Sequence, residues 1–387
     1  MKKTKKFNWQ HVIMISSAHM LHDIFTSFFA PLLPLLKEKM GLSNSTIGIL
    51  SIIQRLPSLF NPLVGIIADS FPVRYFIIVS PAITAITMSL IGLAPGVVIL
   101  GILLFVTGIS STLFHTPSPV MIKKLSGNKP GKGMSFYMLG GEFARTLGPL
   151  IITAAVSYWG LEGSWRLIPF GLVASFILFI RLRKIPVSQD IQRDTRYDSF
   201  MSTLRELLPF FLILSGFIFF RGISKASLTT FLTIYLDEQG QSLWFVNGAL
   251  SVFQFSGAIG VMFSGTISDR IGSRNTLLII SIATPILMGL FLFAEGGWQF
   301  AVLIALGFFL LSTGPVILSM VTSIKTSHPA FVNGVFMTIS FIVGALAILL
   351  TGIVSDFIGL ENSFRLAALL SIGSLPFVFF MQKWDNK

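Results

Sequence analysis

The sequence contains no cysteine and few charged residues. Without cysteine, disulfide bonds and thiolate metal sites are excluded. Charged residues make up 11% of the 387 positions, whereas soluble domains contain about 25%. Hydrophobic residues make up 53%, and the mean hydropathy is +0.81. This composition excludes a disordered or ordinary soluble chain and indicates a protein that crosses a membrane several times.

Acidic residues are scarcer than basic ones, at 16 against 28, so the formal net charge is +12. Such an excess can indicate nucleic-acid binding, but here the basic residues follow a membrane topology. Four lysines precede the first apolar segment, and the loops predicted on the opposite side hold only Lys37, Lys39, Arg166 and Arg365. By the positive-inside rule we predict cytoplasmic termini, a cytoplasmic-membrane location and no nucleic-acid partner.

The sequence also lacks a phosphate-binding loop of the form GxxxxGK[ST]. The nearest stretch, residues 127–132, has the wrong spacing and follows no predicted strand. We therefore expect no ATP as a power source, no cofactor and no enzymatic activity.

Apolar segments dominate the chain, and each is long enough to cross about 30 Å of hydrocarbon. They lie near residues 9–36, 43–69, 74–94, 96–122, 133–158, 164–182, 206–236, 241–268, 274–294, 297–322, 332–355 and 360–382. The first carries Asp23 mid-span and has no cleavage site, so we interpret it as a retained helix. The charge-rich stretch 183–205 predicts a cytoplasmic linker between two six-helix bundles, residues 1–182 and 206–387. The predicted fold is an all-α membrane protein with twelve transmembrane helices in two pseudo-symmetric bundles.

The two sets of six segments share an internal repeat. Residues 160–167 (GLEGSWRL) return as residues 359–366 (GLENSFRL), and Gln54 is matched by Gln254. Homologous membrane halves around a central site are the architecture of secondary transporters. The repeat therefore predicts transport of a small molecule.

The most specific repeated signal lies at the cytoplasmic ends of the second and eighth segments. It comprises Gly65, Asp69 and Arg74 in the first half and Gly265, Asp269, Arg270 and Arg274 in the second. A helix-end aspartate facing arginines can form an ionic latch, and a glycine lets neighbouring helices approach. We predict a gating role for both sets, the alternative being positive-inside topology alone.

Few charged or histidine residues lie in the middle of the segments, away from their ends, and such residues usually face a cavity or a partner because charge is costly in hydrocarbon. They are His19, His22 and Asp23 in the first segment, Arg55 in the second, His115 in the fourth, Glu142 and Arg145 in the fifth, and Arg221 and Lys225 in the seventh.

His19 and Asp23 lie one helical turn apart, with His22 beside them. We predict that Asp23, assisted by His19 and His22, couples transport to protons. One alternative is a fixed pair, or a salt bridge from Asp23 to Arg55, that only holds the bundle together. Another is a divalent-metal site completed by His115, but the spacing fixes no metal geometry, so we predict none.

Glu142 and Arg145 lie three residues apart and could neutralise each other; otherwise Glu142 is a second proton-coupling carboxylate. The middle of each of the last six segments holds no acidic residue to pair with Arg221 or Lys225, so we predict that these two residues bind an anionic or phosphonate-like substrate. The alternative pairs Arg221 with Asp23 or Glu142. We also predict that substrate is bound by Arg55, His115, Arg145, Gln54 and Gln254. For the two glutamines, the alternative is that they form hydrogen bonds between helices.

Several stretches resemble a known family. They are His19-Met20-Leu21-His22-Asp23, Gln54 with Pro62-Leu63-Val64-Gly65 leading to Asp69, Phe114-His115, and Gly140-Gly141-Glu142-Phe143 leading to Leu147-Gly148-Pro149-Leu150. With the six-plus-six layout, the chain resembles the major facilitator superfamily, and its N-terminal half resembles the fosmidomycin-resistance group of bacterial efflux proteins. The resemblance implies proton-driven export of small drugs. The group's Phe-His-Pro-Glu run is here Phe114-His115-Thr116-Pro117, without the carboxylate, and Glu142 stands where the group usually has Asn.

We therefore predict a monomeric, proton-coupled exporter that moves small drugs or metabolites, including anionic ones, across the cytoplasmic membrane by alternating access. Its partners are protons, a small-molecule substrate and the lipid bilayer. The alternatives are a proton-coupled importer of an organic anion, a divalent-metal transporter and a non-transporting membrane receptor.

Overall fold

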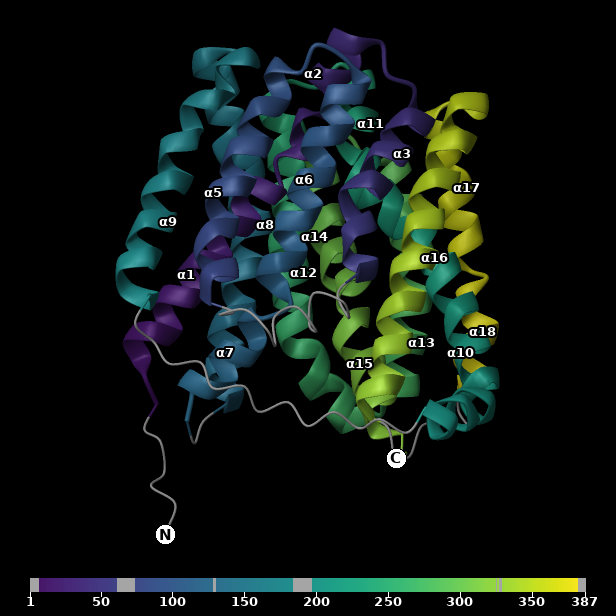
Figure 1. The fold of residues 1–387 in the computed structure, drawn as a ribbon. Helices are drawn as coiled ribbons and strands as arrows, with labels where there is room; N and C mark the ends of the chain where they lie inside the picture. The colour runs from purple at the N-terminus through teal and green to yellow at the C-terminus, as the bar shows by residue number, and fades with distance from the viewer. Residues whose placement is uncertain are drawn as a thin grey trace. The chain divides into compact units, whose positions relative to one another are not determined.

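The computed structural model is helical throughout, as the composition predicts (Figure 1). It describes residues 7–60, 74–127, 130–183, 197–324, 326 and 329–381, and no strand occurs among them. The elements are α1 (Trp9–Thr26), α2 (Phe29–Met40), α3 (Asn44–Arg55), η1 (Leu56–Phe60), α5 (Arg74–Leu90), η2 (Ile91–Leu93), α6 (Val97–His115), α7 (Ser118–Leu125), α8 (Pro130–Trp159), η3 (Glu162–Leu167), α9 (Ile168–Leu182), α10 (Tyr197–Ala226), η4 (Ser227–Phe231), α11 (Leu232–Glu238), α12 (Leu243–Ile271), α13 (Ser273–Phe293), α14 (Gly297–Leu311), α15 (Thr313–Ser323), α16 (Pro329–Ile358), α17 (Leu360–Ser371) and α18 (Ser374–Phe380).

Ten helical segments in the described part of the chain are long and apolar enough to cross a membrane. Two of the twelve predicted spans are outside this set. Span 43–69 continues into residues beyond those described, and span 133–158 is the continuous helix α8. The 30 residues of α8 extend about 45 Å at 1.5 Å per residue, more than the hydrocarbon thickness of about 30 Å. The all-α, multi-pass membrane fold is therefore confirmed.

The chain divides into two compact units. Unit 1 comprises Met1–Leu42, Leu50–Gln192 and Ser242–Ser251, and unit 2 comprises Ser43–Ile49, Arg193–Gln241 and Val252–Lys387. Helix α10 begins at Tyr197, so its first turns lie within the stretch 183–205 that we predict as a linker.

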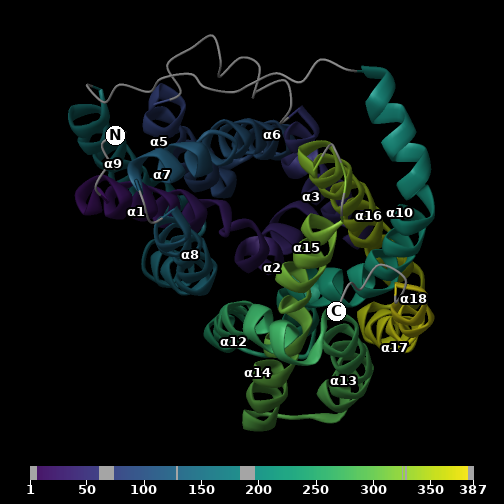
Figure 2. The same ribbon diagram turned by 90° about the horizontal axis from the view of Figure 1, so that it is seen from below.

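Helix α1 of unit 1 carries its buried side chains as one stripe. Val12 and Ile15 start this stripe and belong to a core cluster with Ile77 of α5, Phe114 of α6 and Leu178 of α9. The helix packs most extensively on α8 and then on α5 (Figure 2). The buried positions recur at helical spacing, so the same face of α1 also carries the buried polar residues His19, His22 and Asp23 in the next two turns.

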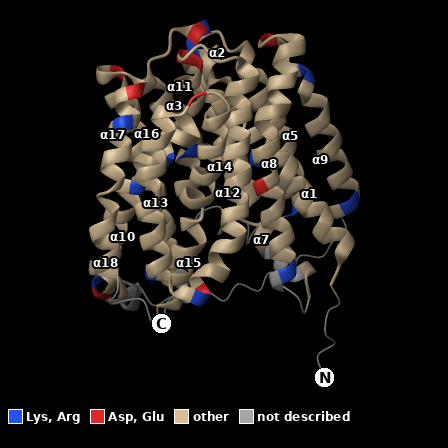
Figure 3. Ribbon diagram, turned by 180° about the vertical axis from the view of Figure 1, so that it is seen from behind, with Lys and Arg blue, Asp and Glu red and all other residues tan. Residues whose placement is uncertain are grey.

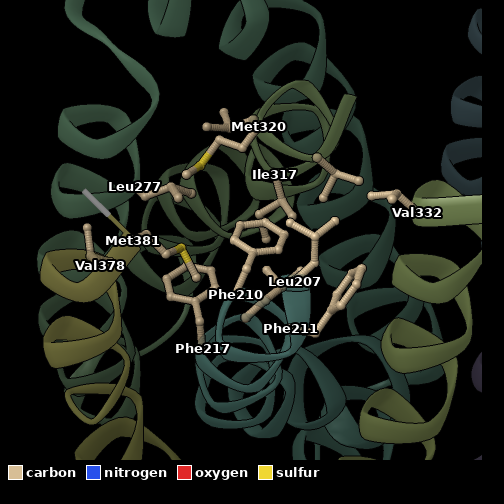
Figure 4. Close-up of a cluster of buried hydrophobic side chains, with 13 residues drawn as sticks. Leu207, Phe210, Phe211, Phe217, Leu277, Ile317, Met320, Val332, Val378 and Met381 are labelled. Carbon is tan, nitrogen blue, oxygen red and sulfur yellow. The ribbon is translucent and has the colours of Figure 1, made fainter. Parts of the chain in front are cut away.

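Unit 2 has its own core between α10, α13, α15 and α18. Figure 4 shows Phe210 and Phe217 of α10 among Leu277 of α13, Met320 of α15 and Val378 of α18. All of these side chains are buried. Helix α10, which carries Arg221, is therefore anchored in unit 2 by a buried apolar core.

The sequence repeat is also visible in the backbone. Gly160 follows α8 with φ +74°, and Gly359 follows α16 with φ +80°. Gly41 and Gly240, at the same spacing along the chain, have φ +62° and +76°. Only glycine adopts this left-handed conformation at no steric cost. In each pair, the two glycines therefore lie just after helices that occupy corresponding positions in the two halves.

Four of the interrupted spans have their breaks at corresponding places in the two halves. The breaks lie between α1 and α2, between α6 and α7, between α14 and α15, and at the π-helical turn η4 between α10 and α11. Interrupted helices mark binding sites in transporters, and π-turns occur often at functional sites. Asp23, His115 and Arg221 all lie within one or two turns of such a break.

Candidate functional site

Charged residues are concentrated near the helix ends, with few along the middle of the helices (Figure 3). Those that lie inside a helix in unit 1 include Asp23 on α1. His19 is one turn earlier on the same helix, and its Nε2 lies 3.2 Å from Oδ2 of Asp23. Both residues are buried, with 4% and 6% of their surface exposed. Local helical spacing thus produces the pair that the sequence predicts.

His115 completes a three-residue cluster with His19 and Asp23. It is the last residue of α6, which stops just before Pro117 because a proline disrupts a helix that continues through it. Its Nε2 lies 3.1 Å from Oδ1 of Asp23. The Asp23 carboxylate is therefore placed between two imidazoles, one from its own helix and one from α6. We refer to His19, Asp23 and His115 as the carboxylate–imidazole cluster.

The protonated nitrogen of His19 follows from its contact with α8. Nδ1 lies 2.7 Å from the carbonyl oxygen of Tyr137, which can only accept, so Nδ1 carries a hydrogen. In a neutral ring Nε2 then has a lone pair, and this lone pair faces Asp23. Two acceptors 3.2 Å apart repel each other unless a cation lies between them. The contact is satisfied by one proton, held either as an imidazolium facing a carboxylate or as a carboxyl group donating to Nε2.

His22 makes a different hydrogen bond. Ser110 Oγ donates to the Ser80 carbonyl at 2.9 Å and so accepts from Thr84 Oγ1 at 2.7 Å. Thr84 Oγ1 in turn accepts from Nδ1 of His22 at 3.1 Å. The His22 ring also stacks on Phe114, with centroids 4.6 Å apart. This network connects His22 to α5 and α6, and its predicted part in proton coupling stays a prediction.

Glu142 and Arg145 form an ion pair on α8. Nη1 of Arg145 lies 3.2 Å from Oε1 and 3.3 Å from Oε2 of Glu142. The Glu142 side chain is 10% exposed and that of Arg145 is 45% exposed. Arg55, at the end of α3, is close enough to Arg145 for their like charges to interact. The three residues, here called the α8 cation cluster, carry two positive charges and one negative charge.

Arg221 of α10 is a buried cation in unit 2. One Nη donates to the carbonyl oxygen of Leu310, and the guanidinium lies 5.8 Å from the ring centroid of Phe217. The other Nη is buried and has no hydrogen-bond partner among the described residues. Lys225, one turn later, is exposed. Since a buried guanidinium donor without a partner is costly, Arg221 is able to receive an anionic group.

The glutamines predicted to bind substrate lie next to helix contacts. Gln54 is partly buried, and a Cβ added to Gly108 would lie 2.0 Å from its carbonyl oxygen. In the second half, a Cβ at Gly307 would lie 2.1 Å from the carbonyl oxygen of Phe253, the residue before Gln254. Close backbone packing at both glycines therefore holds the helices on which the two glutamines lie.

The residues with a predicted gating role are only partly covered by the described part of the chain. Gly65 and Asp69 lie outside the described residues. Arg74 begins α5, with its guanidinium 5.3 Å from the ring centroid of Tyr75.

In the second half, Asp269 and Arg270 are exposed near the end of α12, and Arg274 lies 5.2 Å from the ring centroid of Phe379. Among the described residues, no atom lies within 4 Å of a Cβ built at Gly265, so they show no close helix approach there. The gating role of these residues stays a prediction.

Sequence reasoning missed the residues that orient the cluster. Tyr137 supplies the carbonyl that selects the His19 tautomer, and Thr84 and Ser110 hold His22. The sequence contains no signal for a backbone carbonyl acceptor. The Thr116-Pro117 pair, in contrast, does signal the break that ends α6 beside His115.

The carboxylate–imidazole cluster has donor types that suit a divalent transition metal. One ligand atom from each of its three residues lies within 4.8 Å of the others. A single proton satisfies the same geometry. A metal chelator distinguishes the two cases, because it removes a bound metal ion and leaves a proton in place.

Interrupted apolar helices with ionisable residues buried beside the breaks define a membrane transporter rather than an enzyme. A model of the Major Facilitator Superfamily matches residues 15–348, so the chain belongs to this superfamily. The chain is 26% identical over 379 residues to the fosmidomycin resistance protein of Escherichia coli (strain K12), covering 94% of this chain and 91% of that protein. The predicted resemblance to both groups is confirmed.

Two further similarities agree with this assignment. The multi-drug resistance efflux pump PmrA of Streptococcus pneumoniae is 22% identical over 315 residues, covering 75% of this chain and 78% of the pump. A bacterial homologue of the human lysosomal transporter Spinster, solved in an inward-facing and unoccupied conformation, superposes with a TM-score of 0.78 at 15% identity. This match covers 100% of this chain and 98% of that chain. At this identity the structural likeness shows the fold alone.

Proposed function

We propose that the protein is a proton-coupled exporter of small anionic drugs or metabolites. The superfamily establishes transport of small molecules through a lipid bilayer; the direction, the proton and the anionic substrate are the proposal. The observation that carries it is the contact between Nε2 of His19 and Oδ2 of Asp23. Two acceptors face each other at 3.2 Å there, and one proton resolves their repulsion.

In this mechanism the carboxylate–imidazole cluster binds a proton on one side of the membrane and releases it on the other. Alternation of the two halves exposes the cluster in turn to each side. A membrane potential of 100 mV supplies about 2.3 kcal/mol per proton. One pH unit adds about 1.36 kcal/mol. Together these terms sustain a substrate gradient of about 500-fold for one proton exchanged.

The anionic substrate class is supported by the unbalanced cations. In unit 1 the α8 cation cluster contains two arginines and one glutamate, and in unit 2 Arg221 has a buried donor that no described residue accepts. Guanidinium groups match the oxygens of phosphonates and carboxylates in bidentate fashion. A relative is named for resistance to the drug fosmidomycin, which we use as the probe below.

The proposed topology is a monomer in the cytoplasmic membrane with both termini in the cytoplasm, as the distribution of basic residues predicts. The repeated aspartate and arginine residues at the ends of the second and eighth spans would close the cytoplasmic entrance.

The test uses proteoliposomes that contain a pH-sensitive dye and the purified protein, with fosmidomycin as the probe. Addition of fosmidomycin to one side should drive protons in the direction opposite to its own movement. Asp23→Asn should abolish this coupled proton flux while fosmidomycin exchange down its gradient continues, because an amide donates to Nε2 of His19 without an added proton. Glu238→Gln, at the exposed end of α11, is the matched control and should pump normally.

The outcomes separate the alternatives. Protons that move in the same direction as fosmidomycin would establish an importer instead. Normal pumping by Asp23→Asn would remove the cluster from the coupling mechanism. Loss of coupled flux on addition of a chelator would assign the gap between His19 and Asp23 to a metal ion.

A further inference from the structure

His115 differs from the other members of the carboxylate–imidazole cluster in its exposure. Its side chain is 37% exposed, whereas those of His19 and Asp23 are 5% and 9% exposed. His115 is thus the member with the most accessible surface, and its Nε2 lies 3.1 Å from Oδ1 of Asp23. This ring therefore connects the accessible surface of the cluster with the Asp23 carboxylate.

The second nitrogen of His115 lies next to a hydroxyl group. The Tyr137 hydroxyl is 3.4 Å from Nδ1 of His115. The Tyr137 ring is fixed in place, because it is 3% exposed and stacks on the His19 ring with centroids 4.0 Å apart. When His115 is neutral with its hydrogen on Nε2, which lies 3.1 Å from Oδ1 of Asp23, the Tyr137 hydroxyl donates to the lone pair on Nδ1.

Ser118 offers this hydroxyl a second acceptor. Ser118 Oγ donates to the Phe114 carbonyl at 2.6 Å, and the Ser118 side chain also interacts with the Tyr137 hydroxyl. Since the hydrogen of Ser118 is used by Phe114, Ser118 can only accept from the Tyr137 hydroxyl. When His115 carries hydrogens on both nitrogens, the Tyr137 hydroxyl can turn to Ser118 and accept from Nδ1–H. Tyr137 therefore suits both charge states of His115 without moving its ring.

We infer that His115 is the port through which Asp23 exchanges its proton, and that the Tyr137 hydroxyl is the positioning group that serves both states of the port. This inference rests on the proposed function and moves His115 from the predicted substrate site to proton transfer. A hydronium ion gives its proton to Nδ1 of His115, so one O–H bond breaks and one N–H bond forms. The Nε2–H bond then breaks as an O–H bond forms on Oδ1 of Asp23, and His115 is again neutral.

The ionisable groups that face the port are few. They are His19, His22 and Asp23 on α1 and Tyr137 on α8, while α7 contributes the Ser118 hydroxyl. All of these groups influence how proton exchange at Asp23 depends on pH. The rate of exchange and the equilibrium of proton binding must therefore be measured separately, because only the rate reports on the port.

The experiment follows the Asp23 carboxyl by time-resolved infrared spectroscopy after a pH jump, using purified full-length protein in H2O and D2O. The Asp23 signal is identified by its loss in Asp23→Asn. We expect His115→Gln to slow exchange at least about tenfold, since a positioned proton carrier contributes about 10²- to 10⁴-fold. Tyr137→Phe keeps the stacked ring but should slow exchange and change the pH profile of its rate. Tyr158→Phe, on the same helix and 83% exposed, is the control.

Each result has a separate meaning. If wild-type protein shows no exchange at Asp23, the proposed proton coupling fails as well. If Asp23 exchanges and His115→Gln retains the wild-type rate, only the port is overturned. If His115→Gln loses fosmidomycin binding and retains the exchange rate, His115 belongs to the substrate site. An unchanged rate and pH profile in Tyr137→Phe overturns the positioning role. If that variant fails to fold, Ser118→Ala replaces it, with slower exchange expected.

Discussion

The pair between Glu142 and Arg145 leads to a quantitative prediction for substrate affinity. In the α8 cation cluster, Arg55 and Arg145 are the groups that attract an anion, and Glu142 competes with that anion for Arg145. Glu142→Gln removes the competing charge and leaves the shape of the side chain almost unchanged. An anionic substrate should therefore bind more tightly to this variant.

The magnitude follows from the ion-pair geometry. At 3.2 Å and an effective dielectric constant of about 20, the gross attraction is about 5 kcal/mol. Because the Arg145 side chain is 45% exposed, solvent screening reduces the net value to about 1 kcal/mol. The dissociation constant for fosmidomycin should fall about fivefold, and the gain should shrink at high salt because exposed charges are screened over about 10 Å at 0.1 M.

The assay is equilibrium binding of fosmidomycin to purified protein by calorimetry at two salt concentrations, combined with transport in proteoliposomes. Glu162→Gln is the matched control, because it removes a carboxylate that pairs with Lys39 at 2.9 Å outside the cluster. This control should not change the affinity.

Two results would refute the reasoning. Weaker or unchanged binding in Glu142→Gln would mean that Arg145 does not bind the anion. Normal binding with loss of uphill transport would instead make Glu142 a second proton carrier, which is the role predicted for it if it does not pair with Arg145.

Three further predictions concern single positions. Arg221→Met should raise the melting temperature, because it removes a buried donor that has no partner in the described part of the chain and that costs about 1–3 kcal/mol. It should also abolish transport of anions, and an unchanged or lower melting temperature would contradict this. Gly108→Ala should destabilise the protein by about 1–3 kcal/mol, since its Cβ would lie 2.0 Å from a backbone oxygen. Gly265→Ala, which meets open space, should be neutral or slightly stabilising, and equal losses in thermal melts would refute the packing argument. The first two amides of α3 donate to the Asp356 carboxylate at 2.7 and 2.8 Å. Asp356→Ala should therefore speed hydrogen exchange at these amides about fivefold, since a lost cap costs about 1 kcal/mol. Equal protection in the variant would exclude the cap.

Much of the fold could be predicted because membrane constraints are visible in composition. Apolar runs, basic loops and the repeated GLEGSWRL and GLENSFRL segments are local signals that no tertiary contact has to complete. The positive φ of Gly160 and Gly359 agrees with that repeat. The pairs His19 with Asp23 and Glu142 with Arg145 were predictable for the same reason, since residues three or four apart share a helix face.

Other features of the site depend on long-range packing. The carbonyl of Tyr137, 118 residues from His19, selects which imidazole nitrogen faces Asp23, and the end of α6 places His115 on the other oxygen of the same carboxylate. Helical periodicity shows which side chains share a face, but it does not show which atoms of another helix will meet them. The sequence by itself determined a multi-pass helical transporter with an ionisable first span. Only the packing of α1 against α6 and α8 decided that Asp23 lies between two histidines, because hydrogen-bond partners are set where distant segments come together.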